Sequence, residues 1–400
     1  MLLVFAGVVD EVIGDDVRLE READRAAEVG DFLGDDGVEA EVEAEPAICF
    51  GDLRAEQPGG PGLFPRAALD DAVGFVAVEI GGDFGVEEAA HGVAKGVMVG
   101  ACPGAVGFTL QSDIVADYLV HYASEEQKLR FLPGMVAGTT ISAIAMTEPG
   151  AGSDLQGLKT IARRDGNGFR LSGSKIYITN GQSADLVIVA ARTTEDGGAR
   201  GLSLFLVEAG DDGFSRGRNL DKIGLHGNDT SELFFDDVHL PADRLLGQEN
   251  NGFAMLMNQL PQERLSIAVQ CQGSAQRAYD EAVKFTADRT AFGKRILDFQ
   301  NTRFALADMK TKLQVGWAHL DWAIARHIAG DLTPVEASAA KLWHSEMQWE
   351  ACDIALQLHG GAGYMNEYPI ARLWRDARVA RIYGGTSEIM KELIGRSIGH

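Results

Sequence analysis

The hydrophobic residues of this chain change their period along the sequence, and this change limits the fold more than any other feature. From about Thr140, short segments alternate apolar and polar residues or are rich in β-branched and aromatic residues, as in FRLSGSKIYITNG and LSLFLVEAG. From about Gly252, apolar residues recur with the period of a helix, as in NTRFALADMKTKLQVGWAHLDWAIARHIAG. A period of two is typical of strands and a period of 3.6 of amphipathic helices. The sequence therefore predicts an α+β multidomain chain.

The strand-like segments define a middle domain, residues 140–247. They are short, and turn residues such as Asp165-Gly166-Asn167-Gly168 separate them. Several short strands with this spacing predict a β-barrel or a sandwich of roughly 100 residues.

Helical patterns lie on both sides of this domain. Residues 107–139 are predicted to be helical, with a capping box at Ser124 and a helix that Pro133-Gly134 stops. Residues 248–400 predict an antiparallel bundle of four long helices, in which Pro261 favours a kink in the first helix. Gly360 and Gly361 suit the C-terminal end of the third helix.

Residues 1–106 differ from the rest of the chain. They hold 23 acidic and 6 basic residues and show only weak periodicity. We therefore treat them as an atypical acidic N-terminal region. One hypothesis is that this stretch is read out of frame, and then another frame of the DNA would encode a helical domain.

Composition excludes several classes of protein. A formal charge of −23 argues against a nucleic-acid partner, and no apolar run is long enough to span a bilayer. The apolar start lacks the basic residues of a signal peptide and is too acidic for a transit peptide, so we predict a cytoplasmic protein. Four widely separated cysteines suit free thiols, and the histidines show no metal-ligand spacing, so we predict no metal.

Five short motifs carry candidate chemistry. They are TEPGAGSD (147–154), KIYITNG (175–181), DRTAFGKRILDFQ (288–300), QLHGGAGYMNEYP (357–369) and IYGGTSEIMKE (382–392). Alone, each motif is more simply explained as a loop, a half-buried strand or a helix end. Gly150-Ala151-Gly152 is also a poor dinucleotide fingerprint, because the next glycine comes two positions late and a strand follows where a helix is needed.

Together and in this order, the five motifs resemble the acyl-CoA dehydrogenase family over roughly residues 107–400. The resemblance implies an N-terminal helical region, a middle β-barrel and a C-terminal four-helix bundle. It also implies that FAD lies between barrel and bundle, with its ADP half reaching a neighbouring subunit of a homotetramer.

Carried over by motif, the resemblance implies a set of cofactor and substrate contacts. The flavin contacts would be Ile144, Ala145, Met146, Thr147, Ser153, Tyr177, Ile178, Thr179, Arg289, Gln300, Gln357, Leu358, His359, Gly360, Gly361, Thr386, Ser387 and Glu388. The substrate contacts would be Ser153, Arg264, Gly384 and Gly385. Arg289 suits a pyrophosphate, because a guanidinium can donate two hydrogen bonds to it.

In the family reaction a carboxylate removes an α-proton from an acyl thioester, and the β-hydrogen leaves as hydride to the flavin. Many members carry this glutamate directly after the tyrosine of the C-terminal motif, where this chain has Gly384. In long-chain and isovaleryl-type members it lies on the first long bundle helix. LPQERLSIA (260–268) resembles the long-chain type. We therefore predict Glu263 as the base, in preference to Glu388.

The pattern around Glu263 supports this choice. Leu256, Leu260 and Ile267 share a helix face with Glu263, so its side chain is expected to point inward, where an unpaired acid is costly. The alternative is a surface glutamate that pairs with Arg264.

The leading prediction is an FAD-dependent enzyme that converts saturated acyl-CoA thioesters of medium to long chain length to trans-2-enoyl-CoA. Its electrons would pass to an electron-transferring flavoprotein. One alternative is an acyl-CoA oxidase, which gives its electrons to oxygen. The other is a non-catalytic homologue that binds flavin or acyl-CoA, suggested by Gly384 and by the aberrant N-terminal region.

Overall fold

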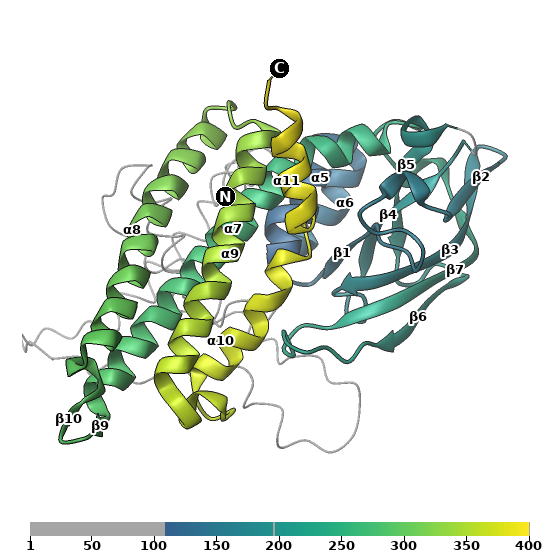
Figure 1. The fold of residues 1–400 in the computed structure, drawn as a ribbon. Helices are drawn as coiled ribbons and strands as arrows, with labels where there is room; N and C mark the ends of the chain where they lie inside the picture. The colour runs from purple at the N-terminus through teal and green to yellow at the C-terminus, as the bar shows by residue number, and fades with distance from the viewer. Residues whose placement is uncertain (1–108, 195–196, 400) are drawn as a thin grey trace, which may run out of the picture. The chain divides into compact units, whose positions relative to one another are not determined.

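The computed structural model of this chain describes residues 109–194 and 197–399. The predictions for residues 1–106 concern residues outside this described part. All described residues belong to one unit of the chain. Figure 1 shows a group of strands and a group of long helices within it.

Among the described residues, three helical segments precede the strands. They are η2 (Leu110–Val115), a short π-helix, and the α-helices α5 (Ala116–Tyr122) and α6 (Glu125–Val136). The predicted capping box is confirmed, because Ser124 and Gln127 exchange hydrogen bonds between side chain and backbone. The prediction that Pro133-Gly134 stops the helix is wrong, because α6 continues to Val136. Proline removes only an N–H donor, and the Pro133 carbonyl still accepts from Ala137.

The middle of the chain forms an eight-stranded sheet within the described residues. Its strands are β1 (Ser142–Ala145), β2 (Ile161–Asp165), β3 (Gly168–Thr179), β4 (Leu186–Arg192), β5 (Leu202–Glu208), β6 (Phe214–Asn219), β7 (Thr230–Leu240) and β8 (Leu245–Leu246). The order is β6-β7-β3-β2-β4-β5-β8, and β1 pairs in parallel with β4. The predicted turn joins β2 to β3, with Asp165 opposite Gly168. The sequence patterns missed β6 and β8.

The sheet curls around one apolar core. Phe169 and Leu171 of β3 and Phe205 of β5 belong to this core. The rings of Phe169 and Phe205 pack edge to face, with their centroids 4.9 Å apart. Phe214 and Leu245, from the two edge strands, pack against the same core. The sheet is therefore curved like a barrel. Hydrogen bonds do not close the ring in the described part, where β6 and β8 remain the ends of the path.

Long helices form the C-terminal domain. They are α7 (Gly252–Asp288), α8 (Gln300–Ile328) and α9 (Pro334–His359), which run side by side (Figure 1). Between α7 and α8 lie the short strands β9 (Thr290–Ala291) and β10 (Lys294–Arg295), followed by η6 (Ile296–Asp298). α7 remains one helix through Pro261. Small side chains on α7 and α9, such as Ala278 and Ala355, belong to a shared core with Leu313 of α8.

The expected fourth long helix is replaced by shorter elements in the described residues. They are η7 (Gly360–Tyr364), α10 (Pro369–Ala377), η8 (Arg378–Arg381) and α11 (Ser387–Arg396). Gly384 and Gly385 explain the interruption before α11, because both have positive φ angles of 63° and 97° that a helix does not allow. The sequence also predicts a last helix from about Thr386, and α11 begins directly after this residue, whose side chain accepts from the N–H of Ile389.

The sheet and the bundle meet through the first helical segments. η2 packs against β1 and against α7, and α5 also packs against α7. A further contact joins the loop before β7 to α10, where the Leu225 N–H donates to Asp376 Oδ1 at 2.7 Å. A short segment from before the sheet therefore lies against the bundle helix that carries Glu263.

Candidate active site

Glu263 is buried on the side of α7 that meets α5. Its side chain is only 5% exposed, so the reading of a surface glutamate paired with Arg264 is wrong. The fully buried Tyr118 donates a hydrogen bond from its hydroxyl to Glu263 Oε1 at 3.0 Å. Burial raises the pKa of Glu263 to about 7, against the opposing effects of Tyr118 and Arg264, and nearby Asp117 adds to the rise. Such a carboxyl group can accept a proton near neutral pH.

Arg264 turns away from Glu263 and contacts the C-terminal glycine turn. Its Nη1 donates to Ser338 Oγ at 3.2 Å, and its Nε lies 3.5 Å from the carbonyl oxygen of Gly384. The buried Lys341 of α9 donates from Nζ to the carbonyl oxygen of Gly385 at 2.6 Å. Burial lowers the pKa of Lys341 to about 8. Two buried basic side chains therefore hold successive carbonyls of this turn.

Gly384 leaves no room for a side chain. A Cβ at this position would lie 2.4 Å from Cδ1 of Ile267, and its φ of 63° disfavours any residue with a Cβ. Ile267 follows Glu263 by one turn of α7. The glycine turn and the helix that carries the carboxylate are therefore in direct contact.

The segment from η2 to α5 holds α7 on both sides of Glu263. Asp113 of η2 accepts from Ser266 Oγ at 2.7 Å through its side chain, and from Gln262 Nε2 at 3.2 Å through its backbone carbonyl. Burial raises the pKa of Asp113, although its hydroxyl partners oppose the rise. Three near neighbours on α7, including Glu263 itself, thus bond to this earlier segment.

On the sheet side, the expected flavin contacts lie at the ends of β1 and β3. Ile144 and Ala145 are buried in β1, while Thr147 follows it and accepts from the Ile176 N–H at 2.9 Å. Tyr177 is 65% exposed with a φ of 62°, beside an irregularity in the β3–β7 pairing. A bulge of this kind can re-aim a side chain, and here it presents an aromatic ring outward.

Other expected contacts on this side differ in exposure. Met146 and Thr179 are half-buried, Ile178 is buried, and Ser153 is exposed in the loop after β1. Beneath this loop, the buried Lys175 holds it by donating to the Met146 carbonyl and to Glu148 Oε1, both at 2.9 Å.

On the bundle side, the expected contacts lie in two separate places, the end of α9 and the start of α11. Gln357, Gly360 and Gly361 are exposed, Leu358 is half-buried, and His359 is buried with its ring stacked on Phe285 at 4.3 Å. The His359 side chain therefore packs in the core.

At α11, the expected contacts have different surroundings. Thr386 caps the helix, and Ser387 is buried and donates to Glu346 Oε1 at 2.7 Å. Glu388 is exposed, and backbone hydrogen bonding at the helix start lowers its pKa. These surroundings give Glu388 none of the raised proton affinity of Glu263.

Arg289 and Gln300 lie apart from Glu263. Arg289 follows Phe285 of α7 by four residues, and Phe285 stacks on His359, so the end of α9 lies at this same end of the bundle. Arg289 and Gln300 are both exposed, at the far ends of α7 and α8. At about 1.5 Å per residue, Arg289 lies roughly 40 Å from Glu263 along the helix. Most of the length of α7 therefore separates Arg289 from Glu263.

The residues at the ends of β1 and β3 fit a flavin. An isoalloxazine ring needs an apolar surface for its face and hydrogen-bonding groups for its edge. The exposed ring of Tyr177 provides the first, and the hydroxyls of Thr147 and Thr179, on adjoining strand ends, provide the second.

Sequence reasoning missed Tyr118, Lys341 and the Glu148–Lys175 ion pair. The sequence did mark the helix that carries Tyr118 as unusual, because Asp113 and Asp117 are one turn apart and interrupt an otherwise apolar helix face. Lys341 gave no comparable signal.

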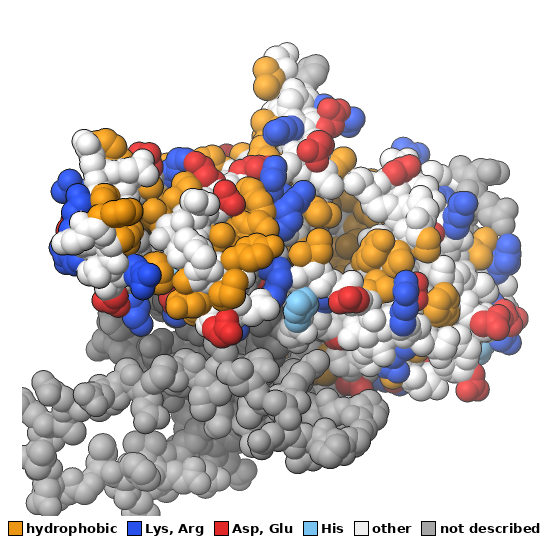
Figure 2. Space-filling model, turned by 60° about the horizontal axis from the view of Figure 1, so that its bottom comes forward, with side chains coloured by type: hydrophobic (Ala, Val, Ile, Leu, Met, Phe, Trp, Pro, Cys, Tyr) orange, Lys and Arg blue, Asp and Glu red, His pale blue; other side chains and the backbone are white. Residues whose placement is uncertain are grey.

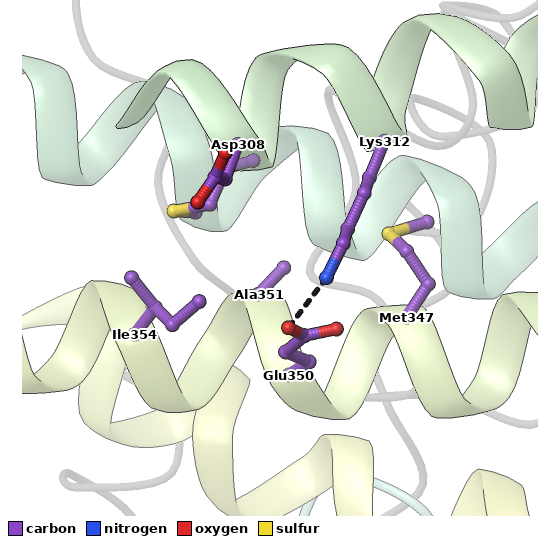
Figure 3. Close-up of a pocket in the computed structure, with 7 residues that line it drawn as sticks. Asp308, Lys312, Met347, Glu350, Ala351 and Ile354 are labelled. Carbon is purple, nitrogen blue, oxygen red and sulfur yellow. Dashed lines mark hydrogen bonds and ion pairs between the residues drawn. The ribbon is translucent and has the colours of Figure 1, made fainter. Parts of the chain in front are cut away.

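A shallow groove elsewhere carries none of the expected site residues. Figure 3 shows it between α8 and α9, where the ion pair of Lys312 and Glu350, 2.5 Å apart, crosses it. Within residues 109–194 and 197–399, no cluster of His, Cys, Asp and Glu has the makings of a metal site. The described helices also include none that is long and apolar enough to cross a membrane.

Three family models match the chain. Residues 250–399 match the C-terminal domain of acyl-CoA dehydrogenase, residues 143–238 the middle domain, and residues 58–139 the N-terminal domain. The last match begins well before residue 107. Similarity to the family therefore extends closer to the N-terminus than the motifs indicated.

Individual proteins are similar over most of the chain. The long-chain specific acyl-CoA dehydrogenase, mitochondrial, of Sus scrofa is 52% identical over 296 residues, which cover 74% of this chain and 69% of that protein. An acyl-CoA dehydrogenase of Bacillus subtilis is 39% identical over 294 residues, covering 73% of this chain and 78% of that one.

Solved structures agree with these matches. The acyl-CoA dehydrogenase from Geobacillus kaustophilus has a TM-score of 0.78 at 42% identity, covering 85% of this chain and 91% of that one. The butyryl-CoA dehydrogenase from Megasphaera elsdenii has a TM-score of 0.77 at 34% identity, covering 84% and 91%. The predicted fold class is confirmed.

Proposed function

The chain belongs to the acyl-CoA dehydrogenase family, and from this premise we propose that Glu263 is the base of an FAD-dependent acyl-CoA dehydrogenase. One observation carries the proposal. A buried carboxyl group with a pKa of about 7 lies on α7, against the glycine turn where many family members place their glutamate.

The protein's own groups divide the work of the reaction. Glu263 takes the α-proton of the acyl thioester, and a base whose pKa lies near the working pH combines availability with proton affinity. Arg264 and Lys341 fix the turn that would pass beside the thioester, through the carbonyls of Gly384 and Gly385. FAD, when bound, supplies the acceptor for the β-hydrogen, which leaves as hydride while the α,β double bond forms.

The flavin would lie against the ends of β1 and β3. Tyr177 would cover one face of the ring, while Thr147 and Thr179 would bond its edge. The residues around Thr386 would complete the site from the bundle side, whereas Gln357 lies near His359, at the same end of the bundle as Arg289. Buried Ile144 and Ile178 support this surface from below and keep water out.

Long acyl chains are the proposed substrates. The mammalian proteins at 51–52% identity are named long-chain specific, whereas the short-chain specific enzyme of Megasphaera elsdenii is 38% identical. A series of acyl-CoAs of increasing length tests this proposal through kcat/KM. A maximum at a short chain would contradict it.

A homotetramer is the proposed assembly. Most of the length of α7 separates Arg289 from Glu263, which supports the binding of the ADP half of a neighbour's FAD by Arg289 and Gln300. Apolar residues on α8 are also exposed, among them Phe304, Val315 and Trp322. Figure 2 shows hydrophobic side chains gathered on one face of the bundle. Light scattering measures the assembly, and R289A should weaken FAD retention in it.

The redox partner and the location also remain proposals. We propose an electron-transferring flavoprotein as the acceptor and, from the sequence, a cytoplasmic location, although the similar mammalian proteins are named mitochondrial. Oxygen uptake compared with reduction of a dye through that flavoprotein separates a dehydrogenase from an oxidase. Fractionation of the source cells tests the location.

The central experiment uses the full chain loaded with FAD. Palmitoyl-CoA added without oxygen should bleach the visible flavin absorbance of the native protein. E263Q should retain FAD and fail to bleach, whereas E281Q, a substitution on the same helix, should behave as native. Bleaching of E263Q at the native rate would refute the assignment of the base. A native protein that binds FAD and never bleaches would instead be a non-catalytic homologue.

A further inference from the structure

We propose that Tyr118 is a positioning residue for the base. Its hydroxyl holds one oxygen of the Glu263 carboxyl group and leaves the other oxygen for the substrate proton. The inference rests on the proposed role of Glu263. It adds a residue that lies 145 positions earlier in the chain, on a different helix.

The first support is the geometry of the contact. Tyr118 is fully buried, and its Oη lies 3.0 Å from Glu263 Oε1. In the described part of the chain, Tyr118 is the hydrogen-bond partner of the Glu263 side chain, and the neighbouring Arg264 points to Gly384 and Ser338 instead. Burial raises the pKa of Tyr118 well above its usual value, so the hydroxyl keeps its proton and acts as the donor.

The second support is the rigidity of the element that carries Tyr118. Its neighbours Val115 and Leu119 are also fully buried. One turn before them, Asp113 bonds to Gln262 and Ser266, which flank Glu263 on α7. The tyrosine hydroxyl is therefore held at the carboxylate by contacts on both sides. A loosely held tyrosine would lose part of its effect to conformational freedom.

Other charged groups near Glu263 must be separated from the effect of Tyr118. Asp117 of α5 raises the proton affinity of Glu263, and Arg264 of α7 lowers it. Asp117 is itself bonded to His121, whose Nδ1 lies 3.1 Å from its Oδ1. Titratable groups on the other elements packed against this part of α7 include Asp113 of η2, His327 of α8 and Lys341 of α9. Removing only the Tyr118 hydroxyl leaves all of these in place.

The direction of the change in the Glu263 pKa depends on which form of the carboxyl group the Tyr118 hydroxyl stabilises. A hydroxyl donor favours the ionised carboxylate over the protonated acid. Without it, Glu263 should hold its proton to higher pH. Since a hydrogen bond to a charged group shifts such an equilibrium strongly, we expect the pKa to rise by roughly one to two units.

The test is the pH profile of flavin bleaching by palmitoyl-CoA in the FAD-loaded full chain. Y118F should move the acid limb of the profile upward by about one to two units relative to the native protein. Y122F is the matched control, because Tyr122 lies one turn later on the same helix and is only half-buried. Its acid limb should stay in place. Equal limbs in Y118F and Y122F would overturn the proposal.

A second measurement does not depend on activity. The free energy of unfolding of the native protein should fall as pH rises from 4.5 to the pKa of Glu263, and in Y118F this fall should continue to higher pH. An unmoved fall would contradict the proposal. E263Q could still bleach while Y118F changes the pH dependence of unfolding. In that case Glu263 is not the base, but the hydrogen bond from Tyr118 to Glu263 does control its pKa.

A near-isosteric change covers the case in which Y118F does not fold. 3-Fluorotyrosine in place of Tyr118 keeps the ring and the hydroxyl and makes the hydroxyl a stronger donor. The acid limb and the fall in stability should then move to lower pH. No movement in either would overturn the proposal.

Discussion

Two buried glutamates, Glu148 in the sheet domain and Glu263 in the bundle, have opposite surroundings. Glu148 accepts from the backbone N–H groups of Lys159 at 2.7 Å and Thr160 at 2.9 Å, and Lys175 Nζ lies 2.9 Å from it. Burial acts to raise the pKa of Glu148, but Lys175 and these hydrogen bonds together lower it. Glu263 has one neutral donor, Tyr118, and burial raises its pKa to about 7.

The difference shows which carboxyl group is available for chemistry. Glu148 has its charge neutralised and its oxygens bonded, so it stays ionised and holds the loop that is expected to contact the flavin. Among the described residues Glu263 has no ion-pair partner, and its burial carries a cost in stability that a purely structural residue has no reason to carry. In the sheet domain the buried charge of Glu148 fixes the backbone, whereas in the bundle the carboxyl group of Glu263 can accept a proton.

The largest expected effect is the loss of reaction rate when Glu263 is replaced. E263Q should lower the rate constant of flavin reduction by about 10²- to 10⁴-fold, the usual contribution of a general base. Its free energy of unfolding should not fall, because glutamine removes a costly buried acid. Stopped-flow bleaching and urea unfolding measure the two quantities. A stable E263Q with native kinetics would break the comparison.

The next effect concerns the stability of the sheet domain. K175M leaves Glu148 buried without its cation, and breaking a buried pair in this way costs about 3–5 kcal/mol of unfolding free energy. K312M is the matched control, because Lys312 forms an exposed ion pair with Glu350. Such surface pairs contribute only about 0–1 kcal/mol. Similar losses in the two variants would show that the buried pair has no special role.

The pH dependence of stability should differ in sign for the two glutamates. The pKa of Glu263 is raised when folded, so its stabilising contribution is complete below its usual value of 4.5 and is lost as pH rises through about 7. The pKa of Glu148 is lowered, so its contribution is present above 4.5 and is lost only as pH falls through the folded value. Of the two glutamates, therefore, only Glu263 should change its contribution to stability between pH 5 and 8.

The measurement is the difference in unfolding free energy between the native protein and E263Q. As pH rises from 5 to 8, the native protein should lose about 3 kcal/mol of stability relative to E263Q. This value follows from the difference of about 2.5 units between the folded and ordinary pKa of Glu263. E281Q should track the native protein throughout. A flat difference for E263Q would mean that Glu263 is not buried as an unpaired acid.

The fold was largely readable from periodicity. The alternation in segments such as β3 and the helical period of α8 reflect burial of one face, which is a local property of the sequence. β6 was missed because FSRGRN has no clear alternation and few apolar residues. The start of the last helix near Thr386 was predicted, but sequence alone does not give the positive φ angles of Gly384 and Gly385 that precede it.

The candidate site was readable in part. Glu263 was identified from its helix face and its motif, but its raised pKa requires the burial that α5 provides. Tyr118 lies 145 residues away in sequence, and no periodicity reports a contact of that range. Lys341 sits in an amphipathic helix like any other lysine. Its role appears only when the carbonyl of Gly385 is placed beside it.

The smallest expected effect compares two glycines with nearly the same backbone conformation. Gly166, in the turn between β2 and β3, has a φ of 60° and open space where a Cβ would be. Gly384 has a φ of 63°, but a Cβ there would lie 2.4 Å from Cδ1 of Ile267. G166A should therefore cost only the conformational penalty, about 1 kcal/mol. G384A should cost about 1–2 kcal/mol more, because the added methyl group overpacks the contact with α7.

A double mutant isolates this extra cost. I267V removes the Cδ1 methyl group, which is the atom nearest to the added Cβ. G384A with I267V should then be less destabilised than the sum of the two single variants, by about 1 kcal/mol in urea unfolding. Strict additivity would mean that the turn moves away from α7 when a side chain is added. In that case the contact between the glycine turn and the helix of Glu263 is loose, and the turn does not exclude a side chain at position 384.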